Sequence, residues 1–351
     1  MKYAHILRAV SETPWAVRPH VLETIRDLLA FRASGGVLTN EEIQARIGAG
    51  PPRREAQVFG SVAVLPLWGV IAPKADMFTE MSGGTSLAAF AQSFRAAMAD
   101  EQVSSIVIDI DSPGGTVDMV PEMGAEILAA RGRKSVVAVA NTVAASAAYW
   151  IGSQASEFVV TPSGEVGSIG VWAAHDDLSK AMDKAGIKTT LISAGKYKTE
   201  GNPFEALSEE ARDYIQSQVD TFYGMFVDAV AAGRETTVSA VRSGFGQGRM
   251  VTAEDARAGG MVDRVATRDQ VLAELIASAR PAQPSQAATA YLPVVTTTDG
   301  TFSTTVTFPA SSETVPNPEP SHEDDTQDAI GLGFAARRIA IHRRRLRQPA
   351  A

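Results

Sequence analysis

Ser146 lies at the junction between two apolar runs that differ in character. The first run, Ser135–Ala140, is typical of a buried strand, and the second, Ala147–Ala155, is rich in small residues and predicted to be helical. A serine at such a junction lies where a helix presents unpaired N–H groups, and its alanine neighbours allow a substrate to approach closely. A serine that merely caps the helix is the simpler interpretation. Whether Ser146 could do chemistry therefore depends on the segments around it.

A proline-glycine-glycine turn follows another strand-like run, Val103–Ile110. It lies in the segment Asp109–Thr116, where the proline favours a turn and Gly114 and Gly115 permit backbone angles closed to other residues. Backbone N–H groups presented by such a loop could form an oxyanion hole, with the N–H of Ala147 as a companion donor. A plain tight turn is the alternative. The catalytic interpretation requires the two loops to be neighbours, as adjacent parallel strands would make them.

A serine nucleophile also needs a base, and two kinds are present. His175 precedes two aspartates, so a triad of Ser146, His175 and Asp177 is conceivable. The second candidates are Lys196 and Lys198, which follow a strand-like run. A lysine serves as a base only if its pKa falls from about 10.4 to near 7, which burial among apolar groups can cause.

The middle of the chain, residues 57–277, alternates strand-like and helix-like segments. This alternation predicts an α/β fold with a mostly parallel sheet. The predicted strands are 61–70, 103–110, 135–140, 158–161, 169–173, 189–193 and 261–265. The predicted helices are 87–98, 117–130, 147–155, 205–232 and one that begins near residue 251.

The two ends differ from this core in composition. Residues 1–56 form a predicted helical extension, with helices at 19–31 and 40–47. We expect it to serve mainly in packing, and a docking or oligomerisation arm is the alternative. Residues 278–325 are rich in proline, serine and threonine and are predicted to be a disordered linker. Residues 326–351 are predicted to form a helix with a basic end. Its arginines either complement the helix dipole or bind an acidic partner, such as nucleic acid or an acidic protein.

Composition excludes several classes of function. The 351 residues contain no cysteine, which excludes disulfides, thiolate metal sites and a cysteine nucleophile. The formal net charge of −8 argues against nucleic acid as the main partner. No apolar run is long enough to span a membrane, and the N-terminus lacks an apolar signal core, so we expect a cytoplasmic protein. The sequence suggests neither a metal nor a cofactor.

Four segments in this order resemble the protease IV / signal peptide peptidase A family of serine peptidases, over about residues 58–265. They are Asp111–Gly115, the small-residue segment around Ser146, Gly164–Val171 and Gly195–Lys198. That family uses a Ser-Lys dyad on a Clp-protease/crotonase-like fold of repeated ββα units. The resemblance therefore implies this fold for residues 57–277.

The resemblance also assigns roles to residues. It implies Ser146 as nucleophile and Lys198 as general base, because the family's base lies in a Tyr-Lys pair shortly before Pro-Phe, here Tyr197-Lys198 and Pro203-Phe204. It implies an oxyanion hole from Gly114 or Gly115 together with Ala147, and supporting roles for Ser168 and Tyr197. His175 then has no catalytic role.

A single core without a membrane anchor resembles the head-maturation proteases of tailed bacteriophages. The resemblance implies cleavage of scaffold, capsid or portal proteins in the host cytoplasm or prohead, by a homo-oligomer whose serine and lysine sometimes come from different subunits. The alternatives are a bacterial signal-peptide-remnant peptidase, a crotonase-type acyl-CoA enzyme and a non-catalytic assembly protein on the same core.

Overall fold

The computed structural model describes residues 14–33, 55–74 and 84–278. The described residues all belong to one compact unit that ends at Ser285. The predicted helix at 40–47, most of the proline-rich linker and the basic terminal helix lie outside the described residues, so those expectations remain predictions.

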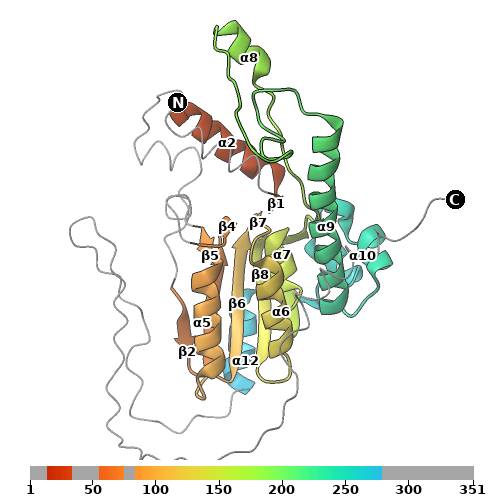
Figure 1. The fold of residues 1–351 in the computed structure, drawn as a ribbon. Coiled ribbons are helices and arrows are strands. Elements are labelled where there is room, and N and C mark those ends of the chain that lie inside the picture. Colours follow the sequence, from red (N-terminus) through yellow and green to blue (C-terminus); the bar gives the residue numbers. More distant parts are fainter. Residues whose placement is uncertain (1–13, 34–54, 75–83, 279–351) are drawn as a thin grey trace, which may run out of the picture. The chain divides into compact units, whose positions relative to one another are not determined.

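A large, mostly parallel sheet forms the centre of this unit (Figure 1). Its strand order is β11-β10-β8-β6-β3-β2, and β9 joins it between β8 and β12. The pairs among β3, β6, β8, β9, β10 and β12 are parallel, and only β2 and β11 pair antiparallel to their neighbours. The prediction of an α/β core with a mostly parallel sheet is therefore confirmed. The strands are β2 Gln57–Phe59, β3 Val62–Trp68, β6 Ser105–Ser112, β8 Ser135–Ala145, β9 Glu157–Val160, β10 Glu165–Gly167, β11 Met250–Thr252 and β12 Arg264–Val265.

A second, four-stranded sheet begins where β6 ends. Its order is β1-β7-β4-β5, with β1 Trp15–Val17, β7 Gly114–Thr116, β4 Ile71–Ala72 and β5 Thr85–Ser86. Because β7 continues directly from β6 through the proline-glycine-glycine turn, this small sheet lies at the carboxyl end of the central strands (Figure 1). In parallel sheets this end carries most ligand sites.

Helices cover both faces of the central sheet. Alternate residues of the strands face opposite sides: Leu65 and Ile108 pack in the main core, while Val64 and Val107 pack with Val271 of α12. The first face is covered by α5, α6, α7 and α9 (Figure 1). The helices are α2 Pro19–Ala33, α5 Leu87–Ala99, α6 Val120–Ala130, α7 Ala147–Gly152, α8 Ser179–Lys184, α9 Glu209–Gly233, α10 Val238–Gly244, α11 Ala253–Ala258 and α12 Arg268–Ser278. None of these described helices is long and apolar enough to cross a membrane.

Three contacts fix α7, the short helix that follows Ser146. The hydroxyl of Tyr149 donates a 2.9 Å hydrogen bond to the carbonyl of Met261, and burial raises the pKa of this tyrosine far above its usual range. The ring of Trp150 stacks on Phe226 of α9, with 4.6 Å between centroids. The guanidinium of Arg131 donates to three successive carbonyls just beyond α7, those of residues 153–155. These contacts hold the start of α7 in place.

Two predicted strands are absent from the described structure. Residues 189–193 form no strand, and Ile192 is 95% exposed, since this segment has no sheet edge to pair with. Of residues 169–173, only Trp172 forms a bridge, and its partner is Trp15 of β1. β1 itself was not expected, because three residues give no periodic signal.

Candidate active site

Ser146 occupies a strained turn between β8 and α7. Its φ of 56° and ψ of −117° lie in a region that L-residues rarely adopt, and its amide donates a 2.8 Å hydrogen bond to the carbonyl of Gly167. Its hydroxyl does not cap α7 and instead lies 3.4 Å from the carbonyl oxygen of Gly170. The simpler interpretation of a capping serine is therefore wrong for this conformation. A serine that is strained and not used as a cap is one whose hydroxyl is available for another purpose.

The proline-glycine-glycine loop lies beside Ser146, as the sequence predicted. Parallel pairing of β6 with β8 brings Ser112 opposite Ala144, which places the two loops together. Gly114 has a φ of 99°, and a Cβ built on it would lie 3.0 Å from the Cβ of Ser146. Only glycine allows this approach, so the close contact of the two loops depends on Gly114.

The backbone amides near Ser146 differ in their surroundings. The amide of Gly114 donates to the hydroxyl of Ser112 at 3.2 Å, and that hydroxyl donates to the carbonyl of Gly69 at 2.6 Å. Gly115 lies between Ala16 of β1 and β4 of the small sheet. The amide of Ala147 is one of those that a helix leaves without an intrahelical partner. Ser112 is a positioning residue of this loop that the sequence analysis did not single out.

Of the two predicted supporting residues, Ser168 lies next to the partner of Ser146, and Tyr197 lies on the segment that carries the lysines. Ser168 is buried, has a φ of 53° and donates its amide to the carbonyl of Arg249 at 2.9 Å. It directly follows Gly167, which accepts the amide of Ser146, so it lies in the strand end that supports the serine. Tyr197 is 53% exposed and lies on the segment between β10 and α9.

No hydrogen bond joins Lys198 to Ser146 among the described residues. Lys198 is exposed, and within the described residues its ammonium group makes no hydrogen bond or ion pair. The segment that carries it extends away from the central sheet, with α8 at its far end (Figure 1). The Ser-Lys dyad expected from the sequence therefore remains a prediction.

Lys196 is held as a cation by its neighbours. Its ammonium group donates to the hydroxyl of Tyr197 at 2.7 Å and to the carboxylate of Glu210 at 3.0 Å. These two hydrogen bonds raise the pKa of Lys196 far above its ordinary value. A general base needs the opposite shift.

His175 and Asp177 do not form a hydrogen-bonded catalytic triad with Ser146 in the described structure. A ring nitrogen of His175 lies 3.2 Å from the carbonyl oxygen of Asn202. The carboxylate of Asp177 accepts hydrogen bonds from the amide and hydroxyl of Ser179, and these lower its pKa. Neither side chain hydrogen-bonds to Ser146 among the described residues.

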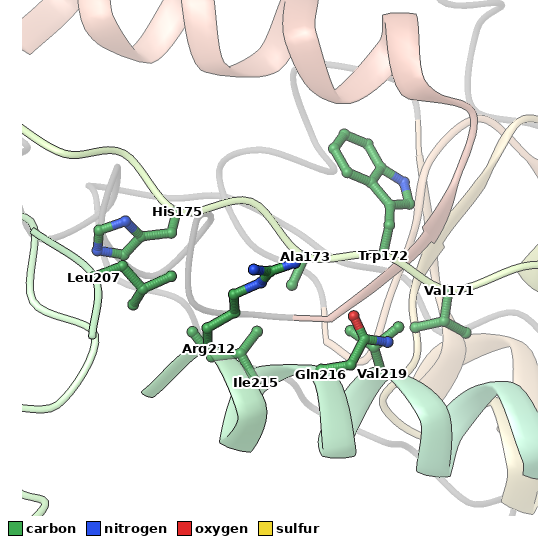
Figure 2. A pocket seen from close by; sticks show the side chains of 9 residues that line it. All are labelled: Val171, Trp172, Ala173, His175, Leu207, Arg212, Ile215, Gln216 and Val219. Carbon is green, nitrogen blue, oxygen red and sulfur yellow. The ribbon is translucent and has the colours of Figure 1, made fainter. Parts of the chain in front are cut away.

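A cavity of about 350 Å³ lies between residues 171–175 and the first half of α9 (Figure 2). Its lining combines aliphatic side chains with two polar ones that reach in from α9, Arg212 and Gln216. Ser146 does not line it, whereas Trp172, the bridge partner of β1, does. The cavity is therefore separate from Ser146. It adjoins residues 171–175, the segment whose Trp172 pairs with β1. Within the described ranges no cluster of three or more His, Cys, Asp or Glu side chains could hold a metal ion.

The sequence matches a known peptidase family. Residues 129–280 match the family model described as "Peptidase family S49", so the chain carries a peptidase S49 domain. The matched range includes the serine turn, the lysine segment and α9. This match agrees with the resemblance seen in the motifs.

Phage and bacterial proteins are among the similar sequences. The chain is 35% identical over 211 residues to the head-tail preconnector protein GP5 of Enterobacteria phage P21, covering 60% of this chain and 42% of that protein. It is 33% identical over 219 residues to the capsid assembly protease C of Escherichia phage lambda, covering 61% and 50%. It is 30% identical over 220 residues to protease 4 of Salmonella typhi, covering 62% and 35%.

The matches to these relatives are partial. The chain spans half or less of the length of each of the three. Among solved structures, the S97A mutant of 1510-N membrane-bound stomatin-specific protease aligns with a TM-score of 0.39 and 15% identity, covering 62% of this chain and 85% of that one.

Proposed function

We propose that the chain is a serine endopeptidase in which Ser146 is the nucleophile. The observation that carries this is the strained, uncapped serine at the start of α7, packed against Gly114. A hydroxyl at this position can attack a peptide carbonyl whose oxygen is received by the N–H of Ala147 and one from the loop of Gly114 and Gly115. The S49 domain and the protease relatives support the same chemistry.

Lys198 is the proposed general base, and it reaches Ser146 from a second copy of the chain. Two observations support this. Lys196 is held as a cation by Tyr197 and Glu210, whereas the ammonium group of Lys198 makes no hydrogen bond or ion pair among the described residues. Lys198 is also exposed, on the segment between β10 and α9 that carries α8, which suits contact with a neighbouring copy. Transfer into an apolar interface would lower its pKa toward the value a base requires.

The proposed substrates are capsid, scaffold or portal proteins cleaved during phage head maturation. This rests on the two phage relatives, whose names are a capsid assembly protease and a head-tail preconnector protein. The proposed setting is the host cytoplasm or the prohead, where such proteins assemble. A homo-oligomer is part of the proposal, because the dyad needs two copies.

The test is covalent labelling with a fluorophosphonate probe combined with peptide turnover by the assembled full chain. We expect the unmodified chain to be labelled at Ser146 and to hydrolyse a peptide drawn from the phage scaffold. Ser146→Ala should abolish both, and mass spectrometry of the labelled peptide identifies the residue. Labelling at another serine, or turnover by Ser146→Ala, would refute the nucleophile.

A further inference from the structure

We propose that residues 15–17 are a built-in inhibitor: β1 lies in the peptide cleft beside Ser146 as a substrate strand would, and it must leave before the serine can react. This inference rests on the proposed peptidase function and adds the regulation of the same site. The sequence predicts mainly a packing role for this part of the chain, with a docking or oligomerisation arm as the alternative. Three features of β1 argue for more than packing.

The first feature is that β1 is paired on both of its edges. On one side it runs antiparallel to β7, with Ala16 opposite Gly115 and Trp15 opposite Thr116. On the other side Trp15 and Trp172 exchange two backbone hydrogen bonds of 2.9 and 3.0 Å. An extended peptide binds a protein in this way, by adding main-chain hydrogen bonds to exposed strand edges. β1 therefore fills a strand-shaped slot between β7 and the segment that carries Trp172.

The second feature is the distance from this slot to the serine. A Cβ atom built on Gly114 would lie 2.2 Å from the carbonyl oxygen of Ala16 and 3.0 Å from the Cβ of Ser146. A backbone carbonyl of β1 is thus a direct neighbour of the serine turn. Ala16 is fully buried and Ser146 is 1% exposed. No external peptide can reach Ser146 while β1 stays there.

The third feature is that the attachment of β1 is local and small. Trp15 and Val17 pack in a small cluster with Leu22 and Val70, and of the three residues of β1 only Ala16 packs in the main core. The indole N–H of Trp172 donates to the carbonyl of Val17 at 3.1 Å. A three-residue strand on such a cluster can leave without unfolding the central sheet, since its contacts are few compared with those of the main core.

The helix that follows β1 links the slot to the lysine segment. Arg26 of α2 forms an ion pair with Asp176, which lies on the segment between β10 and α9 that also carries Lys198. One N-terminal element therefore covers the serine and holds the lysine segment against its own chain. Release of β1 and α2 would free both parts of the proposed site at once.

A reversible disulfide tests whether β1 must leave. Arg18 donates to the carbonyl of Pro113, and hydrogen-bonded pairs alternate along an antiparallel ladder, so Trp15 and Thr116 face each other at a non-hydrogen-bonded position. Such pairs suit disulfide geometry, and the chain has no other cysteine to interfere. The full-length double variant Trp15→Cys/Thr116→Cys locks β1 when oxidised and releases it when reduced.

We expect oxidation of this variant to slow fluorophosphonate labelling of Ser146 by roughly tenfold or more, corresponding to about 1.4 kcal/mol in the closed-to-open equilibrium. Reduction should restore labelling, to a rate above that of the unmodified chain, because the packing of Trp15 is lost. The single variants Trp15→Cys and Thr116→Cys are the controls, and their labelling should not respond to oxidant. Equal labelling of the oxidised and reduced double variant would overturn the inference.

A second variant covers the case in which the disulfide does not form. Val17→Asp places a charge in the small apolar cluster and should expel β1, increasing the labelling rate of Ser146. His20→Asp, at an exposed position of α2, is the matched control and should leave the rate unchanged. No increase for Val17→Asp, in a chain whose circular dichroism is native, would contradict the inhibitor role.

A binding measurement separates this inference from the proposed function. A fluorescent peptide with the sequence of residues 13–18 is titrated into the double variant carrying Ser146→Ala, and anisotropy is recorded in both redox states. We expect binding to the reduced protein only. Binding that does not depend on the redox state, or no binding at all, would overturn the inference. Binding that switches while the Ser146 form is never labelled would support the strand slot and refute the proposed peptidase instead.

Discussion

At the scale of single residues, the backbone of Ser146 is strained, and no helix cap made by its side chain compensates for this strain. Its φ of 56° and ψ of −117° are costly for serine, by about 1–3 kcal/mol, and the hydroxyl offsets none of this by capping α7. Glycine adopts these angles freely. A residue that strains the backbone without a structural benefit is best explained by what its side chain does.

This strain predicts that Ser146→Gly is more stable than Ser146→Ala. Alanine retains the strain, whereas glycine relieves it at a cost of about 0.5–1 kcal/mol in the entropy of the unfolded chain. The net difference should be about 1 kcal/mol in favour of glycine, measured as the free energy of unfolding in urea. Equal stabilities would mean that the turn is not strained in solution.

The two neighbouring lysines should respond differently to removal of charge. Lys198→Met should abolish peptide turnover, because the hydroxyl of Ser146 loses its proposed base. Lys196→Met should retain turnover within a few-fold, since it removes an exposed ion pair with Glu210 and an exposed hydrogen bond to Tyr197. Both variants keep the side-chain length, so the comparison isolates the ammonium group. Loss of turnover in Lys196→Met alone would reverse the assignment.

His175 should be dispensable. Its ring contacts the carbonyl of Asn202, and Asp177 is engaged by Ser179, so neither is arranged to activate Ser146. His175→Ala should therefore keep turnover close to that of the unmodified chain. A triad histidine would lose about 10⁴-fold or more in kcat, which makes the two outcomes easy to tell apart.

At the scale of elements, a half-buried ion pair connects the end of α9 to the strands beneath the site. The carboxylate of Asp263 accepts from Arg234 at 2.6 and 2.9 Å and from the amide of Phe158 at 2.6 Å. Burial acts to raise the pKa of Asp263, but the hydrogen bonds and charge of Arg234 outweigh it, and the pKa is lowered. The ionised form is therefore bound more strongly in the folded chain than in the unfolded chain.

This predicts a pH-dependent stability difference between Asp263→Asn and the unmodified chain. Because the folded-state pKa is depressed, the stabilisation is fully present above the unfolded value of about 3.9 and disappears as the pH falls through the folded value. We expect Asp263→Asn to cost about 1–2 kcal/mol near pH 7, a figure reduced for partial exposure, and less at low pH. Urea unfolding at several pH values measures it, with the exposed Asp183→Asn of α8 as control.

The elements also show which features the sequence could predict. Long periodic segments were predictable: the helix expected at 205–232 is α9, Glu209–Gly233, and Ser208 caps it by accepting the amide of Ala211. The neighbouring positions of Gly114 and Ser146 were predictable too, because parallel pairing of consecutive strands brings their ends together. β1 was not predictable, since its three residues are defined by partners about 100 and 157 positions away, Gly115 and Trp172. The position of Lys198 was not predictable either, because it depends on the course of a segment that has no periodic pattern.

At the scale of the whole molecule, the site is incomplete in one chain if Lys198 is the base. Ser146 is buried at the start of α7, whereas Lys198 is exposed on the segment between β10 and α9. Assembly would then act as an activity switch, with the isolated chain inactive both because β1 covers Ser146 and because the base is absent. The two controls would be coupled, since the N-terminal element that carries β1 also holds the lysine segment through the ion pair of Arg26 with Asp176.

Mixing two inactive variants tests the shared site directly. Ser146→Ala retains Lys198, and Lys198→Met retains Ser146, so neither forms a complete dyad alone. If the dyad forms between copies in a head-to-tail ring, an equal mixture that is allowed to reassemble should recover roughly a quarter of the turnover of the unmodified chain, since about that share of sites would pair an intact serine with an intact lysine. The double variant Ser146→Ala/Lys198→Met, mixed with either single variant, is the control and should recover nothing. Sedimentation verifies that the subunits have exchanged. A mixture that assembles fully and stays inactive would show that serine and lysine must come from the same chain, and the segment that carries Lys198 would then have to fold back onto its own chain.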